Sequence, residues 1–174
     1  LLQQIMKTDY ADQVMEAAEC ILDVIRAGRK ILIAGNGGSA ADAQHMAAEF
    51  VVRFEKDREG YPAIALTTDS SILSAGGNDY GFDAVYERQV QALGFEGDAF
   101  IAISTSGNSE NIIRAARMAA NKKMKVIGMT GLDGGKVKPF WDILLCVPHE
   151  RTARIQEMHE HTIHLLCQIV EQNI

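Results

Sequence analysis

The segment spanning residues 31–49 constrains the fold and the function of this chain more than any other. It joins an apolar stretch (ILIA, 31–34) through a glycine-rich turn (GNGG, 35–38) to an alanine-rich stretch with a helical pattern (39–49). Such a turn leaves backbone N–H groups free at the start of the helix, where the helix dipole favours an anion. The segment therefore predicts a binding site for a phosphate or another anionic group.

Strands and helices are expected to alternate along the whole chain. Five apolar stretches have strand character and lie at 30–34, 63–66, 99–103, 126–129 and 143–147. Most are continuous rather than alternating, as in a sheet covered on both faces. Helical patterns lie at 10–27, 39–54, 83–92, 109–122 and 152–172. This alternation predicts an α/β fold with a five-stranded parallel sheet. The loops at the carboxyl ends of its strands, at 35–39, 67–79 and 104–109, are then expected to form the site.

Composition excludes several classes of protein. The 174 residues suit one domain, and the net charge of −6 argues against non-specific binding of nucleic acid. No apolar run reaches the ~18 residues of a membrane span, and no secretion signal is apparent at the N-terminus. The cysteines are odd in number and widely spaced, which favours a reducing, cytoplasmic setting. They are Cys20, Cys146 and Cys167.

A second polar loop, STSGNS at 104–109, also follows a strand and opens a helix. Its four hydroxyls, on Ser104, Thr105, Ser106 and Ser109, suit phosphate oxygens, and helix capping explains only one or two of them. The pattern Gly35-x-Gly37-x-x-Ala40 formally matches a dinucleotide fingerprint, but no acidic residue ends the second strand. A sugar phosphate therefore fits the two loops better than a dinucleotide.

A third polar loop is expected at Gly76–Asp79, where Asn78 and Asp79 could hydrogen-bond sugar hydroxyls. The alternative is an ordinary turn.

Histidines and carboxylates on two predicted helices offer acid–base or metal chemistry. His45 and Glu49 lie four residues apart, so both side chains share one helix face within roughly 6 Å. With His164 they would form a zinc-type set of nitrogen and oxygen donors, although spacing alone does not establish a metal. A solvated pair is the alternative for His45 and Glu49. The last helix also carries Gln156, His159 and His161.

Several segments together resemble the SIS (sugar isomerase) domain family, and within it the phosphoheptose isomerases. The matching segments are GNGGSAADAQHMAAE (35–49), PAIALTTD (62–69), GNDYGF (77–82), ISTSGNS (103–109), TGLDGGK (130–136) and TARIQEMH (152–159), followed by His164. The resemblance covers nearly the whole chain from residue 28 onward.

The resemblance implies a flavodoxin-like three-layer α/β/α sandwich, with residues 1–174 as a single SIS domain and 1–27 as an N-terminal helix that packs in the oligomer. It also implies a homotetramer with sites at subunit boundaries. The implied reaction converts D-sedoheptulose 7-phosphate to D-glycero-D-manno-heptose 7-phosphate through an enediol. That step is the first toward ADP-heptose for bacterial lipopolysaccharide.

The resemblance also assigns roles to residues of this chain. It implies Glu49 and His164 as the acid–base pair. It implies one zinc ion per subunit, with the ligands His45, Glu49, Gln156 and His164. It implies substrate contacts from Asn36, Gly37, Gly38, Glu49, Asn78, Asp79, Ser104, Thr105, Ser106, Ser109 and Gln156.

Two alternatives remain at this stage. Some SIS domains act without catalysis as sensors or assembly factors, and one relative binds a bacterial replication initiator. The presence of both Glu49 and His164 favours an enzyme, since an adaptor needs neither. An isomerase acting on another sugar phosphate, such as an arabinose or hexulose phosphate, is the second alternative, because pocket shape rather than a motif selects sugar length.

Overall fold

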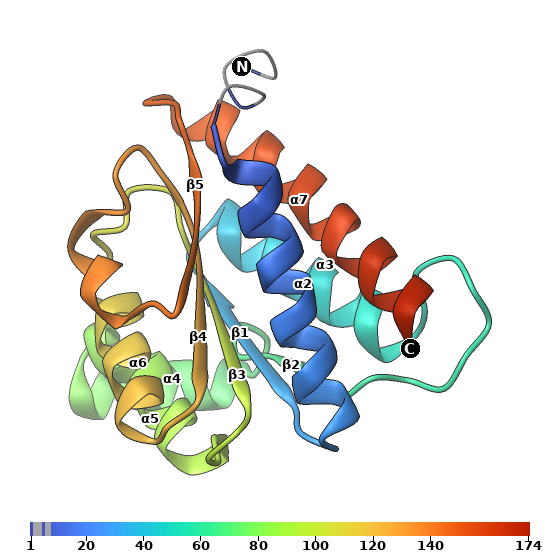
Figure 1. Ribbon diagram of the computed structural model, residues 1–174. Helices are drawn as coiled ribbons and strands as arrows, with labels where there is room; N and C mark the ends of the chain where they lie inside the picture. The colour runs from blue at the N-terminus through green and yellow to red at the C-terminus, as the bar shows by residue number, and fades with distance from the viewer. Residues whose placement is uncertain (2–4, 6–7) are drawn as a thin grey trace.

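The computed structural model describes residues 1, 5 and 8–174, which are arranged in three layers about one parallel sheet (Figure 1). The strands are β1 (Ile31–Gly35), β2 (Ala63–Ala65), β3 (Ala99–Ser104), β4 (Lys125–Gly131) and β5 (Ile143–Val147). Their order in the sheet is β2-β1-β3-β4-β5, and every neighbouring pair is parallel. This is the flavodoxin-like order, and it confirms the predicted fold class.

Helices cover both faces of the sheet. On one face lie α2 (Tyr10–Arg26), α3 (Gly38–Val51) and α7 (Thr152–Asn173), and on the other lie α5 (Val85–Leu93) and α6 (Glu110–Asn121) (Figure 1). Alternate residues of each strand feed the two cores, so Ile31 and Ile33 pack with the first group of helices and Leu32 with the second. Both faces of the central strands β1 and β3 are buried, which explains why their sequences are continuously apolar.

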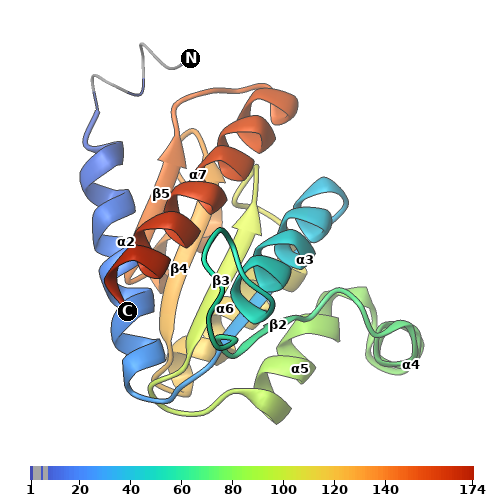
Figure 2. The same ribbon diagram turned by 90° about the vertical axis from the view of Figure 1, so that its right-hand side faces the viewer.

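Helix α2 lies against α7 on the first face, as Figure 2 shows. The Tyr10 hydroxyl and the Thr162 hydroxyl form a buried hydrogen bond of 2.8 Å between the two helices. The prediction that residues 1–27 form an N-terminal helix that packs in the oligomer stays a prediction, and residues 2–4 and 6–7 lie outside the described residues. Across the described chain, no helix is both long enough and apolar enough to cross a membrane.

The expected third polar loop is wrong as a description of local structure. Residues Ser70–Tyr80 form helix α4, so Gly76–Asp79 lie in its last turns. The Asp69 carboxylate caps this helix by accepting a hydrogen bond of 2.9 Å from the Ile72 N–H. Such a cap is worth about 1 kcal/mol, which offsets much of the low helix propensity of the two glycines.

Two short 3₁₀ helices also occur among the described residues. The first, η1 (Phe82–Ala84), precedes α5, so the single helix predicted at 83–92 has two parts. The second, η2 (Gly135–Phe140), lies between β4 and β5.

Candidate active site

A cavity lies at the carboxyl ends of β1 and β3, where the strand order reverses. In open α/β sheets this reversal point is where ligands bind. The cavity measures about 300 Å³ and receives side chains or backbone from both glycine–hydroxyl loops and from α7. Its lining residues are Asn36, Gly37, Gly38, Ser39, Ile103, Ser104, Thr105, Ser109, Thr152 and Gln156.

Three helices begin at this cavity. Helix α3 starts at Gly38, α6 starts after Ser109, and α7 starts at Thr152. Their N-cap residues are Gly37, Ser109 and Arg151, and in the described structure no side chain caps any of the three helices. The N–H group of the first residue of each helix, Gly38, Glu110 or Thr152, donates to no acceptor among the described residues, and three positive dipole ends meet at one place. This arrangement suits an anion such as a phosphate.

Buried hydrogen bonds fix the first loop. The Asn36 and Asn111 side-chain amides exchange two hydrogen bonds of 2.9 Å, which tie the loop to the first turn of α6. The Tyr86 hydroxyl donates to the Gly35 carbonyl at 2.7 Å. Gly37 adopts a φ of +57°, a conformation that favours glycine. Sequence reasoning missed Asn111 and Tyr86, because only the fold brings them to this loop.

The second loop presents three of its four predicted hydroxyls to the same cavity, and Ser106 is not among the described residues that line it. The Ser104 hydroxyl donates to the Ser109 hydroxyl at 3.2 Å, so these two side chains lie side by side at the end of β3. Thr105 also lines the cavity. The Ser106 hydroxyl accepts a hydrogen bond of 3.1 Å from the Asn108 N–H and is exposed. The loop therefore offers hydroxyl donors next to the free N–H groups of α6.

A cluster of imidazoles and carboxylates lies between α3 and α7. His45 Nε2 lies 2.9 Å from His164 Nε2 and 3.7 Å from Glu49 Oε1. The structure thus brings together three predicted site residues that are distant in sequence. All three side chains are partly exposed, with 36% for His45, 21% for Glu49 and 46% for His164. A substrate can therefore reach them.

Sequence reasoning missed Glu160 in this cluster. Glu160 Oε1 lies 3.3 Å from His45 Nε2 and 3.7 Å from His164 Nε2. Donor atoms of His45, Glu160 and His164 lie within 4.8 Å of one another and could hold a metal ion. The signal was present in the sequence, since Glu160 stands one helical turn before His164 and so shares its face.

Asp42 is a second missed carboxylate near the cluster. Burial, and after it the charge of Glu160, raise the pKa of Asp42 to about 6, and His45 opposes the shift. Asp42 Oδ2 is buried and has no hydrogen-bond partner among the described residues. Negative charge therefore gathers on the side of the cluster that faces the start of α3.

The other predicted site residues lie in two different places. Gln156 lines the cavity and lies one turn before Glu160 on α7. Asn78 and Asp79 lie at the end of α4, are exposed, and hydrogen-bond each other at 2.7 Å. Neither Asn78 nor Asp79 is among the described residues that line the cavity. Figure 2 shows α4 projecting away from the sheet.

The remaining histidines of α7 lie on other faces. His159 is fully buried beside the Thr130 carbonyl, at 3.2 Å, and burial lowers its pKa to about 4. His161 lies beside Tyr10 and Val14 in an apolar groove between α2 and α7. Neither belongs to the cluster around His45.

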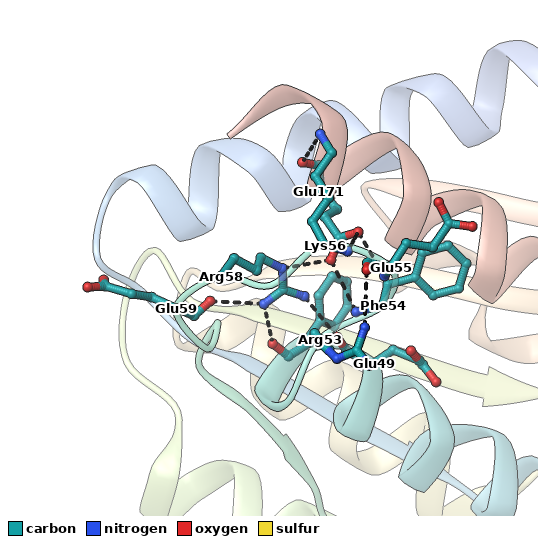
Figure 3. A network of polar contacts seen from close by, with 9 residues as sticks. Glu49, Arg53, Phe54, Glu55, Lys56, Arg58, Glu59 and Glu171 are labelled. Carbon is teal, nitrogen blue, oxygen red and sulfur yellow. Dashed lines mark hydrogen bonds and ion pairs between the residues drawn. The ribbon is translucent and has the colours of Figure 1, made fainter.

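A buried ion pair fixes the segment that follows α3 (Figure 3). Glu171, 5% exposed, accepts hydrogen bonds from the Arg58 guanidinium at 2.9 Å and from three backbone N–H groups of residues 54–56. Burial alone would raise the pKa of Glu171, but the N–H donors and Arg58 hold it at about 2. Arg58 also donates to the Glu49 carbonyl at 2.9 Å. The pair therefore anchors the end of α3 that carries Glu49.

Comparison with known proteins agrees with this architecture. The family model for the SIS domain matches residues 1–131. The phosphoheptose isomerase of Geobacter sulfurreducens is 50% identical over 97% of this chain and 89% of its own length. That of Methylibium petroleiphilum is 55% identical, covering 91% of this chain and 80% of its own.

Solved structures give the same result. The structure of phosphoheptose isomerase GmhA from Neisseria gonorrhoeae matches with a TM-score of 0.92 and 48% identity, covering 98% of this chain and 90% of that one. An identity this high over nearly the full length of both chains establishes a common family as well as a common fold. The chain belongs to the SIS domain family and, within it, to the phosphoheptose isomerases.

Proposed function

We propose that this chain is an aldose–ketose isomerase that converts D-sedoheptulose 7-phosphate to D-glycero-D-manno-heptose 7-phosphate. One observation carries the proposal: an anion-binding cavity lies one turn of α7 from a cluster of two imidazoles and two carboxylates. One turn is roughly 6 Å, so a sugar whose phosphate occupies the cavity can extend toward the cluster. The similarity to phosphoheptose isomerases supports this substrate.

The phosphate is expected to bind at the three helix N-termini. Hydroxyls of Ser104, Thr105, Ser106 and Ser109 would donate to its oxygens, and the N–H groups of Gly37 and Gly38 would extend the anion site toward the sugar. Asn36 is held rigidly by Asn111 and is placed to contact a sugar hydroxyl. Gln156 approaches the same cavity from α7.

Glu49 and His164 are the proposed acid–base pair. Glu49 takes a proton from C1 of the ketose and returns it to C2, so the C1–H bond breaks and the C2–H bond forms through an enediol. His164 moves the accompanying proton from the C1 hydroxyl to the C2 oxygen. Glu49 is anchored at its helix end by Arg58, and His164 contacts His45, so both side chains are positioned before substrate arrives.

The donor set around His45 fits a zinc ion. Bonds of about 2.0–2.1 Å in a tetrahedral site place donor atoms roughly 3.4 Å apart. The separations of 2.9 Å to His164 and 3.7 Å to Glu49 bracket that value. His45, Glu49, Gln156 and His164 are the proposed ligands. When bound, zinc would supply a Lewis acid that polarises the substrate carbonyl.

Incubation of the purified chain with sedoheptulose 7-phosphate tests the proposal. We expect the aldose to form, and a chelator to suppress its formation until zinc is restored. Turnover of a shorter ketose phosphate but not of this one would indicate another sugar-phosphate isomerase. A folded, zinc-supplied chain that turns over neither would indicate a non-catalytic adaptor, the alternative that the similarity to phosphoheptose isomerases does not favour.

Replacement of Ser109 by alanine tests the phosphate site. A hydrogen bond to a charged group contributes about 1.5–3 kcal/mol, so we expect KM to rise roughly 10-fold or more with a small change in kcat. Steady-state kinetics measures both constants. Ser74→Ala is the control, because the Ser74 hydroxyl is exposed on α4 and bonds only to the Ser71 carbonyl. An unchanged KM in Ser109→Ala would remove this hydroxyl from the phosphate site.

A homotetramer with sites at subunit boundaries is part of the proposal. Asn78 and Asp79 do not line the described cavity of their own chain, and a second copy would bring them to a substrate if the sites lie at subunit boundaries. Large apolar side chains are exposed on β2, α4 and η1 and are available for such contacts: Ile64, Ile72, Tyr80 and Phe82. Three free thiols, at Cys20, Cys146 and Cys167, support a cytoplasmic location.

A further inference from the structure

We infer that Asn111 is a positioning residue for the anion site, and that it acts through Asn36 on the glycine-rich turn at 35–38. Asn111 is not among the described residues that line the cavity, whereas Asn36 is. The two side chains are joined by a reciprocal pair of hydrogen bonds. The inference rests on the phosphate site of the proposed function and adds to it a residue that the sequence pattern does not single out.

The two anion-binding loops leave the sheet toward opposite faces. Gly35, at the end of β1, is paired in the sheet with Ile103 of β3. Beyond this pair, the first loop leads into α3 on one face of the sheet, and the second leads into α6 on the other face (Figure 1). The hydrogen-bond ladder of the sheet therefore no longer sets the distance between the loops, so other contacts have to hold them in place.

The Asn36–Asn111 pair supplies such a contact. Each amide donates to the oxygen of the other at 2.9 Å, and in the described part of the chain no other side-chain hydrogen bond joins residues 36–38 to residues 104–111. Asn111 is 3% exposed and stands in the first turn of α6. Burial of an amide without a partner is costly, so paired side chains are strongly favoured. The pair therefore fixes the start of α3 relative to the start of α6.

The composition of the first turn explains why this contact matters. Asn36 carries the only side chain in the sequence GNGG (35–38). Glycines lose more conformational freedom on ordering than any other residue, and Gly37 adopts a φ of +57°. Asn111 binds the turn through the one side chain that it offers. The N–H groups of Gly37 and Gly38 are thereby ordered before an anion arrives.

The pairing also orients the Asn36 amide at the cavity. A primary amide has two N–H donors, and its oxygen accepts two hydrogen bonds. The pair uses one donor and one lone pair of Asn36, so one of each remains for a ligand. Because two parallel hydrogen bonds fix the plane of the amide, these remaining groups keep a constant direction. Loss of Asn111 would loosen the turn and also free this amide to rotate.

Anion binding by the Asn111→Ala variant tests the inference. Isothermal titration calorimetry measures the Kd for inorganic phosphate, and steady-state kinetics measures KM and kcat for sedoheptulose 7-phosphate. Binding then has to order the turn, so we expect the phosphate Kd and KM each to rise roughly 10-fold. We expect kcat to change by less than about 3-fold, because the lost binding is common to the ground state and the transition state.

The same replacement in an Asn36→Ala background shows whether Asn111 acts through Asn36. In that background the partner amide is already absent, so we expect Asn111→Ala to weaken phosphate binding by less than about 2-fold. An equal loss of phosphate affinity in both backgrounds would mean that Asn111 acts independently of Asn36, and would overturn the inference.

Replacement of Gln89 by alanine is the matched control. Gln89 is also a buried amide, 6% exposed, and donates to the Leu66 and Val85 carbonyls outside the cavity. Denaturant unfolding compares the stability of the two variants. We expect Gln89→Ala to lose stability but to keep its phosphate affinity. An equal loss of phosphate affinity in Gln89→Ala would point to general loosening and overturn the inference. If Asn111→Ala does not fold, Asn111→Ser, which keeps a polar group at the buried position, takes its place in each measurement.

The outcomes separate this inference from the proposed function. Unchanged phosphate affinity in a folded Asn111→Ala variant would overturn the inference and leave the isomerase intact. Phosphate binding that depends on Asn111, in a chain that does not isomerise sedoheptulose 7-phosphate, would support the inference and overturn the substrate. A wild-type chain that binds no phosphate would overturn the inference, and turnover by that chain would still support the isomerase.

Discussion

Replacement of Glu49 by glutamine is expected to lower kcat by ~10²–10⁴-fold, the usual cost of losing a positioned acid or base. Glutamine keeps the size and the helix position of the side chain but cannot accept the proton from the sugar. The carboxylate lies 3.7 Å from His45 and its helix end is held by Arg58, so the fold is expected to persist. Steady-state kinetics and far-ultraviolet circular dichroism measure the two effects.

Exchange with solvent identifies the step that is lost. In deuterium oxide, the wild-type enzyme should place solvent deuterium on carbon when it returns the proton, whereas Glu49→Gln should not. Asp57→Asn removes a carboxylate from the exposed segment after α3 and is the matched control. Near-normal turnover in Glu49→Gln would remove this residue from the mechanism. Loss of turnover that excess zinc restores would assign Glu49 to metal binding alone.

Replacement of Glu171 by alanine is expected to lower the free energy of unfolding by roughly 3–5 kcal/mol, the range for breaking a buried ion pair. The change leaves the Arg58 guanidinium and three backbone N–H groups without their shared acceptor. Denaturant unfolding measures the loss. Glu157→Ala, on the exposed face of the same helix, should change stability by no more than about 0.5 kcal/mol.

The stabilisation by Glu171 should also depend on pH. Its pKa in the folded chain is about 2, below the ordinary 4.5, so the unfolded chain binds more protons between these values. The stabilisation is complete above pH 4.5 and is lost as the pH falls toward 2. The difference in unfolding free energy between wild type and Glu171→Ala should therefore shrink on acidification. A difference that stays constant down to pH 3 would contradict the role assigned to this carboxylate.

Much of the fold could be predicted from local sequence. The five strands are continuously apolar because the sheet is covered on both faces, and their predicted positions agree with the structure to within a few residues. Helix α4 could not be predicted in this way, since the residues GGND (76–79) just before its last residue suggest a turn. An Asp69 cap and contacts with its neighbours η1 and α5 outweigh that local preference.

The candidate site also has parts that local sequence predicts and parts that depend on how distant elements pack. The anion-binding loops at 35–39 and 104–109 could be predicted from local sequence, because a glycine-containing turn before a helix leaves backbone N–H groups free for an anion. The residue types of His45, Glu49 and His164 suggested a shared site, but spacing alone could not establish that His45 meets His164, because that depends on how α3 and α7 pack. Glu160, Asn111 and the Arg58–Glu171 pair were missed, since each gains its meaning from a partner on another element.

The brevity of the edge strand has a consequence for how copies of this chain can associate. Strand β2 spans Ala63–Ala65 and follows a proline, so this border of the sheet offers few unpaired backbone groups for a strand of another molecule to join. If copies of this chain associate at this border, their contact has to use side chains rather than strand pairing. A substitution at the exposed Ile64 would then alter that contact while the interior of the chain stays unchanged.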